Sequence, residues 1–223
     1  KPRCMIFREL PPAWRLPLLL MAMASLLTGV LGGLARLAVD VPIFAQVRAG
    51  GHGALMITAF FGTVISLERA VALHRFWPYF GPFFAGFGGI ILLAQGPWWL
   101  PPLLFCLAGC VLLAASLQVW RQLPVLFTFT LLFGAAAWLA GNIAWLGGME
   151  IGTAALFWMS FLVLTIAGER LELTRFLPPQ PLGQKIFIAL LALIATALAL
   201  LPFAAEIGSQ LLAGAFLILA GWL

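Results

Sequence analysis

The chain has 223 residues, of which 64% are hydrophobic and 9% charged, and its mean hydropathy is +1.11. A soluble domain carries about 25% charged residues, so this composition excludes an ordinary soluble globule. A helix needs about 20 residues to cross about 30 Å of hydrocarbon, and eight such spans would leave residues only for a tail and short loops. The sequence therefore predicts an all-α protein, a polytopic transmembrane bundle of about eight helices.

Eight continuous apolar segments follow one another along the chain, and Pro and Gly mark most of their boundaries. They cover about 16–39, 51–73, 76–95, 98–122, 124–147, 152–173, 185–203 and 207–223. Residues 1–223 are thus predicted to form a single transmembrane domain. Because the chain stops within an apolar run, we expect it to be a piece of a longer protein, truncated at its C-terminus.

The basic residues predict the orientation, because Lys and Arg that flank short loops resist translocation. Two of them, Arg36 and Arg48, fall on one side of the predicted spans. The other ten fall on the opposite side: Lys1, Arg3, Arg8, Arg15, Arg69, Arg75, Arg121, Arg170, Arg175 and Lys185. We expect a multi-pass protein of a bacterial inner membrane with a cytoplasmic N-terminus. Since this distribution follows from topology, the net charge of +5 does not indicate a nucleic-acid partner.

An internal repeat is indicated by similar endings of the second and sixth spans. Ile65-Ser-Leu-Glu-Arg-Ala closes the second span and Ile166-Ala-Gly-Glu-Arg-Leu closes the sixth, with Glu68 and Glu169 101 positions apart. Four spans separate the copies, so both would point the same way. We predict two parallel four-helix halves, about 14–122 and 124–223, related by an axis along the membrane normal. The alternative is chance similarity between helices rich in Leu, Ala and Gly.

The Glu-Arg endings belong to an inner cluster of ionisable residues, Glu68, Arg69, Glu169, Arg170, Glu172 and Arg175. Adjacent residues on one helix project about 100° apart, so Glu68 cannot face Arg69. We predict reciprocal structural ion pairs across the repeat axis, Glu68 with Arg170 and Glu169 with Arg69. A proton or cation relay is the alternative, because ionisable groups inside a membrane often have a function.

The outer cluster contains the candidate cofactor site. It comprises Arg36, Asp40, Arg48, His52, Met56, Asn142 and Glu150. His52 and Met56 are four residues apart, so an imidazole and a thioether would share one helix face within about 6 Å. These donors suit copper or haem iron. The equivalent residue of the second half is Thr153, so the repeat does not itself require a histidine there. A hydrogen-bonded structural histidine is the alternative.

The other candidate donors are predicted to have structural or solvated roles. His74 lies 22 positions after His52, about 33 Å along a helix, so a bis-histidine haem would need a second subunit or a segment outside this chain. Cys106 and Cys110 are also four residues apart, and we expect them to pack between helices rather than to bind a metal. Glycines such as Gly29, Gly33, Gly86 and Gly89 predict close helix packing.

Motifs for common soluble chemistry are missing from the sequence. It has no nucleotide-binding glycine loop with Lys, no zinc-protease histidine pair and no nucleophile elbow, so hydrolytic or ATP-driven activity is not expected. No catalytic residue is assigned, and whether the protein is an enzyme stays open.

The stretch His52-Gly-Ala-Leu-Met56-Ile-Thr-Ala-Phe60 resembles two known patterns. One is the second helix of the catalytic subunit of haem-copper oxidases, in which a histidine is an axial ligand of the low-spin haem. The other is the NnrS-type family of haem- and copper-containing membrane proteins. The resemblance implies that His52, with Met56, holds haem b or copper near the outer face. It does not extend to oxidase catalysis, because the binuclear-site histidines have no counterparts. The Glu-Arg endings also resemble those of uncharacterised bacterial inner-membrane proteins.

The leading interpretation is a membrane protein that binds haem or copper through His52 in respiratory or nitrogen-oxide-related physiology. One alternative is a small-solute transporter or channel that uses mid-depth hydroxyls, of which Thr58, Thr63, Ser160 and Thr165 are the main candidates. Another is a structural or assembly subunit. The lipid bilayer is the expected partner, together with other membrane subunits or a second copy of the chain.

Overall fold

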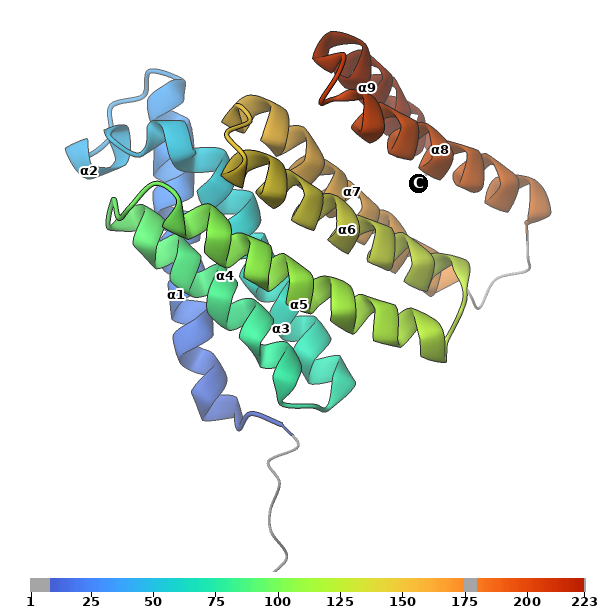
Figure 1. Cartoon of the computed structure of the whole chain (residues 1–223), viewed down its shortest axis with the longest axis horizontal. Coiled ribbons are helices and arrows are strands. Elements are labelled where there is room, and N and C mark those ends of the chain that lie inside the picture. Colours follow the sequence, from blue (N-terminus) through green and yellow to red (C-terminus); the bar gives the residue numbers. More distant parts are fainter. Residues whose placement is uncertain (1–8, 175–179, 223) are drawn as a thin grey trace, which may run out of the picture. The chain divides into compact units, whose positions relative to one another are not determined.

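The fold is seen in a computed structural model that describes residues 9–174 and 180–222 (Figure 1). Within these residues every regular element is helical and no strand occurs, which confirms the all-α class. In chain order the elements are α1 (Pro12–Arg36), α2 (Ile43–Gln46), η1 (Ala49–Gly51), η2 (Ala54–Phe61), α3 (Gly62–Leu73), η3 (Trp77–Tyr79), α4 (Phe80–Leu93), α5 (Leu100–Gln122), α6 (Leu126–Leu146), α7 (Ile151–Thr174), α8 (Pro181–Leu200) and α9 (Ala205–Trp222).

Each of the eight predicted spans has a helical counterpart. Seven helical stretches of the described chain are long and apolar enough to cross a membrane: α1, the continuous Ala54–Leu73, and α5 to α9. The remaining one, Trp77–Leu93, is shorter than the 76–95 span expected from the sequence. It ends early because Gln95 adopts a left-handed conformation (φ 56°) directly before Gly96-Pro97. By length and composition the chain is a multi-pass membrane protein.

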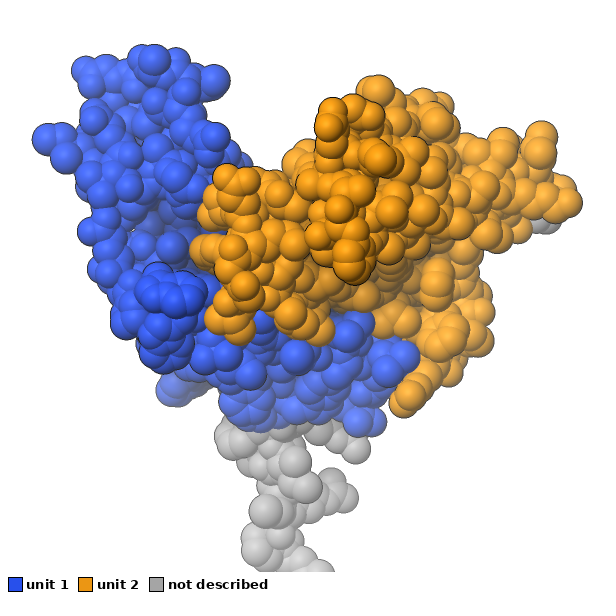
Figure 2. Space-filling model, turned by 45° about the horizontal axis from the view of Figure 1, so that its top comes forward, with its two compact units in different colours: residues 1–119 blue, residues 120–223 orange. Residues whose placement is uncertain are grey.

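The chain divides into two compact units, coloured separately in Figure 2. Unit 1 comprises residues 1–119 and unit 2 residues 120–223, so the boundary lies in the last turn of α5. This boundary is close to the end of the first predicted repeat at residue 122. The structural equivalence of the two halves remains a prediction.

Unit 1 is held together by glycines that let its helices touch. A Cβ placed on Gly89 of α4 would lie 2.5 Å from Ser25 Oγ of α1 and 2.7 Å from Ala59 Cβ of η2. About one turn earlier in α4, a Cβ on Gly86 would lie 3.1 Å from Met21 Cε. A side chain therefore does not fit at Gly89 unless its neighbours shift, and at Gly86 Met21 would have to give way by a few tenths of an ångström. Both contacts agree with the packing role predicted for these glycines.

In unit 2, aromatic rings fill the contact between α6 and α7. The rings of Trp138 and Phe161 stack with centroids 5.2 Å apart, and Trp145 meets Trp158 edge-on at 5.4 Å. Gly141 makes room for them, because a Cβ there would lie 2.8 Å from Trp158 Nε1. Both Trp138 and Trp158 are fully buried, so this hairpin closes as an apolar core.

Candidate functional site at His52 and Met56

The site begins with an unusual helix. Directly after His52-Gly53 the chain forms a π-helix, η2, over Ala54–Phe61, and only then continues as the α-helix α3. At its end the Gly62 N–H donates to the carbonyl of Ile57, five residues back. π-helices are rare and occur frequently at functional sites. The sequence predicts a helix over this segment, but its apolar pattern gives no sign of the wider turn.

His52 and Met56 face the same helix, α1, as their spacing predicts. A Cβ placed on Gly33 would lie 3.1 Å from His52 Nδ1, and one placed on Gly29 would lie 2.7 Å from Met56 Cγ. Gly29 and Gly33 are one turn apart on α1, so the two donor side chains occupy successive positions along one seam. We call the contact formed by Gly29, Gly33, His52 and Met56 the glycine seam.

The imidazole of His52 has an unsatisfied nitrogen. Its Nδ1 is buried and makes no hydrogen bond with any described residue. A buried polar atom without a partner costs about 1–3 kcal/mol, so such atoms call for an explanation. The alternative of a hydrogen-bonded structural histidine does not account for this atom.

Arg48, the charged residue nearest to His52 in sequence, is engaged by the backbone. Its Nε donates to the carbonyl of Leu93 at 2.7 Å, and its Nη1 donates to the carbonyl of Phe44 at 2.5 Å. The guanidinium thereby fastens the connection between α1 and η2 to the last turn of α4. These two donors are used structurally, and Arg48 forms no ion pair with an acidic residue in the described chain.

Few other ligands are available to a metal at His52. In the described parts of the chain, no group of three or more His, Cys, Asp or Glu side chains could hold an ion together. Any metal here would depend on His52 with Met56, the pair that the sequence predicts.

The second histidine lies at the opposite end of unit 1 and is exposed, as predicted. His74 Nδ1 pairs with a carboxylate oxygen of Glu9, whose other oxygen accepts from Arg15 Nη2 at 3.3 Å. The Arg15 guanidinium also lies 5.8 Å from the centre of the Tyr79 ring. Sequence reasoning missed Glu9, because the contact joins residues 65 positions apart and no local pattern marks it.

The cysteines of α5 differ in exposure. Cys106 is buried, in agreement with the predicted packing role, whereas Cys110 is exposed. The residues of the inner cluster lie on helices of different units: Glu68 and Arg69 on α3, Glu169 and Arg170 on α7. Their reciprocal pairing therefore remains a prediction, and Arg175 is outside the described residues.

The mid-depth hydroxyls bond to their own helices. Thr58 Oγ1 donates to the carbonyl of Ala54 at 2.8 Å, and Thr63 Oγ1 to that of Ala59 at 2.5 Å. In unit 2, Ser160 and Thr165 donate in the same i to i−4 pattern at 2.9 and 2.8 Å. This is the ordinary way in which hydroxyls are satisfied inside apolar helices. The four hydroxyls thus have structural partners and do not themselves point to a solute pathway.

Comparison with known proteins adds a family without an activity. Residues 15–223 match the sequence model of a family described as "Domain of unknown function (DUF8744)". No curated protein matches the chain. No solved structure matches it either. Since the match covers nearly the whole chain, the protein belongs to the DUF8744 family.

Proposed function

We propose that this membrane protein binds copper, in the Cu(I) state, through His52 and Met56 at the glycine seam. The observation that carries the proposal is the buried Nδ1 of His52, which has no hydrogen-bond partner in the described chain. A free imidazole nitrogen is a good metal ligand, and metal binding would satisfy it.

The donor set favours copper among the common metals. Copper(I) prefers soft ligands, and Met56 supplies a thioether on the same side of the helix as the imidazole. When bound, the ion would supply one-electron redox chemistry or act as transported cargo. This chain's residues would hold it in a site that glycine makes narrow, with Arg48 anchoring the adjacent connection through backbone carbonyls.

Haem fits the seam less well than an ion does. The side chains of His52 and Met56 already lie in van der Waals contact with Gly33 and Gly29, and a haem macrocycle is far wider than such a contact. Haem on His52 would therefore require a surface outside the glycine seam, such as a second subunit. The absorbance spectrum described below tests for this binding of haem.

The resemblance to NnrS-type proteins points to the same pair of residues and to respiratory or nitrogen-oxide-related physiology. With the N-terminus in the cytoplasm of a bacterial inner membrane, His52 would lie near the outer face. This orientation is tested by thiol-reactive labelling of intact cells that carry a single cysteine introduced either at Gly50 or at Arg75. Labelling from outside at position 75 but not at position 50 would contradict it.

The binding test uses the full chain, purified in detergent and freed of metal. Cu(I) is titrated against a chromophoric chelator under reducing conditions. We expect one Cu(I) per chain, and a loss of affinity of at least about tenfold in both His52→Ala and Met56→Leu, since even second-shell changes cost that much. His74→Ala and Met159→Leu are matched controls, because both side chains are exposed and lie outside the seam.

The absorbance spectrum of the same preparation separates the alternatives. A haem absorbance band in the wild type that disappears in His52→Ala would show that the ligand of His52 is haem and not copper. Cu(I) affinity that is equal in the wild type, His52→Ala and Met56→Leu, with no haem band, would contradict the proposal altogether.

A further inference from the structure

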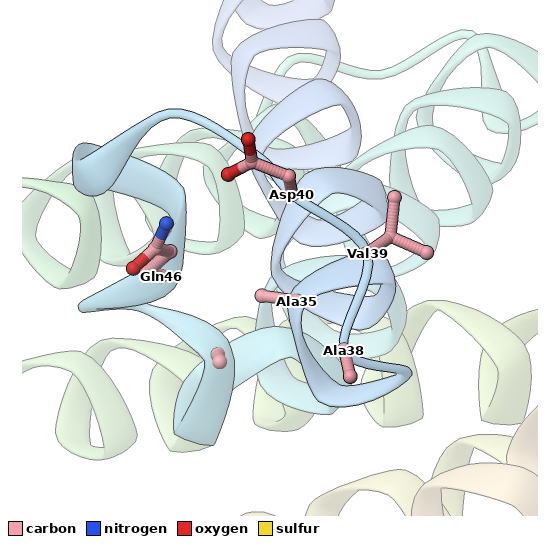
Figure 3. Close-up of a pocket in the computed structure, with 6 residues that line it drawn as sticks. Ala35, Ala38, Val39, Asp40 and Gln46 are labelled. Atoms are coloured by element: carbon pink, nitrogen blue, oxygen red, sulfur yellow. The ribbon is translucent and has the colours of Figure 1, made fainter.

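A pocket of about 380 Å³ opens in unit 1 where α1 passes into its connection with η2. Its lining residues are Ala35, Ala38, Val39, Asp40, Gln46 and Ala49. Figure 3 shows the Asp40 carboxylate directed toward the side of the pocket that carries Gln46. The walls are otherwise alanine and valine, so the polar chemistry of the pocket is confined to these two side chains.

These polar groups offer acceptors to a ligand. Gln46 uses one N–H of its Nε2 to donate to the carbonyl of Val41 at 2.7 Å, which leaves its amide oxygen as the acceptor and its second N–H as a donor. Asp40 is exposed and forms neither an ion pair nor a hydrogen bond with the described residues. Although Arg36 is four residues before Asp40, they are not paired, because α1 ends at Arg36 and Ala38 turns the chain with φ 59°. The pocket therefore suits a cation that carries N–H donors.

The surroundings place this pocket at the level of lipid headgroups. The connection exposes large apolar side chains, including Leu37 at 76% and Ile43 at 77%. Arg48 fastens it to the last turn of α4, after which Trp98 and Trp99 are exposed at 74% and 46%. Exposed Trp close to helix ends marks the membrane–water interface. Side chains such as Ile43 would then lie among acyl chains, with the pocket beside the headgroups.

We infer that this pocket binds the ammonium headgroup of an aminophospholipid, with Asp40 as its counter-ion. The headgroup of phosphatidylethanolamine is a primary ammonium joined by two methylenes to a phosphate. The ammonium matches the Asp40 carboxylate and the Gln46 amide oxygen, and the methylenes match the alanine walls. Arg36 supplies a cation for the phosphate, since it has no ion pair in the described chain and stands between the lining residues Ala35 and Ala38 in sequence.

A lipid is favoured over a free amine by the apolar side chains around the pocket. A single exposed ion pair contributes little to affinity, so Asp40 alone would bind a dissolved amine only weakly. A lipid gains further from its acyl chains against Leu37 and Ile43, and its concentration in a bilayer is high.

The test measures which lipids the full chain retains. Purified protein is equilibrated with mixed micelles that contain equal amounts of phosphatidylethanolamine and phosphatidylcholine, and retained lipid is counted by native mass spectrometry. Both headgroups are cations, but the quaternary ammonium of phosphatidylcholine lacks N–H donors. We expect phosphatidylethanolamine to be enriched about two- to fivefold, which is the range that one net hydrogen bond allows. Asp40→Asn should abolish the enrichment, and Asp40→Glu should preserve part of it.

The matched control is Glu206→Gln, which removes an exposed carboxylate in the first turn of α9 that does not line the pocket. It should leave the enrichment unchanged. Equal retention of the two lipids by the wild type, or undiminished enrichment in Asp40→Asn, would overturn the inference. If soluble phosphoethanolamine competes as well as the intact lipid, the inference of a lipid ligand would be overturned, and the pocket would instead bind a free amine.

Discussion

Units 1 and 2 each contain a pair of membrane-length helices joined through glycine, but they fill the contact differently. In unit 2, Gly141 of α6 admits the Cβ of Phe157 and the indole ring of Trp158 from α7. In unit 1, Gly29 and Gly33 of α1 admit Met56 and His52. One contact is closed by aromatic side chains whose polar atom at Gly141 is an indole N–H, and the other contains an imidazole nitrogen and a thioether sulfur that can donate to a metal.

The sequence offset of 101 makes this difference specific. Under that offset His52 corresponds to Thr153, and Met56 to Phe157. The described helices differ at the same place, because η2 is a π-helix whereas α7 is α-helical from Ile151 to Thr174. An apolar side chain suffices to close a glycine contact, as unit 2 demonstrates. Packing against glycine therefore does not by itself require the donors of unit 1.

The largest loss of stability is expected when a side chain is added at the aromatic contact of unit 2. Gly141→Ala places a methyl group 2.7 Å from Phe157 Cβ, and overpacking of a rigid core costs about 1–3 kcal/mol of the free energy of unfolding. Denaturant titration in mixed micelles measures this loss, and Cu(I) affinity should not change. Gly214→Ala, where a Cβ meets open space, is the control. An equal loss of unfolding free energy in both variants would contradict the view that the aromatic contact at Gly141 is tightly packed.

The same substitution in unit 1 should affect the ligand more than the fold. In Gly33→Ala the new Cβ lies 3.1 Å from His52 Nδ1, so the imidazole can shift by a few tenths of an ångström. We expect a Cu(I) affinity lower by up to about tenfold, which is the cost of a displaced ligand, with little change in unfolding. Gly53→Ala is adjacent to His52 but meets nothing within 4 Å, so its Cu(I) affinity should match the wild type. A Cu(I) affinity of Gly33→Ala equal to that of the wild type would contradict the assignment of His52 Nδ1 as a ligand.

The helix types predict different local stability. Amide hydrogen exchange should be faster over Ala54–Phe61 than over residues 155–162 of α7 by about tenfold, because the wider π turn opens at lower free energy. Exchange resolved by mass spectrometry compares the two segments within one sample. If Cu(I) binds at His52, its addition should slow exchange in the first segment alone. Equal protection of both segments would contradict the difference in helix type.

The smallest effect concerns the buried indoles of unit 2. Trp138 Nε1 is buried without an acceptor in the described chain, so Trp138→Phe removes both an unsatisfied donor and some apolar area. These contributions oppose each other, and we expect a net change within about 1 kcal/mol. Phe161→Leu, which removes only the stacked ring, should cost about 1–2 kcal/mol. A larger loss in Trp138→Phe would mean that its N–H has a partner.

Periodic and compositional features were predictable from the sequence, whereas contacts between distant residues were not. Apolar length fixes the helices, because an unpaired backbone is too costly in hydrocarbon, and the i to i+4 spacing puts His52 and Met56 on one face. The π turn of η2 lies where this segment packs against α1, and no local sequence pattern marks it. The partnership of Glu9 with His74 and the bond from Arg48 to the carbonyl of Leu93 arise from tertiary contact and have no signature in the chain.

The two bonds of Arg48 also decide where the chain tolerates foreign sequence. A reporter or epitope inserted between Phe44 and Arg48 would separate Phe44 from Leu93, which this side chain now connects. The turn at Gly148, with φ 90° and open space around it, has no such tie. Anyone who maps the topology of this protein with inserted tags should begin there.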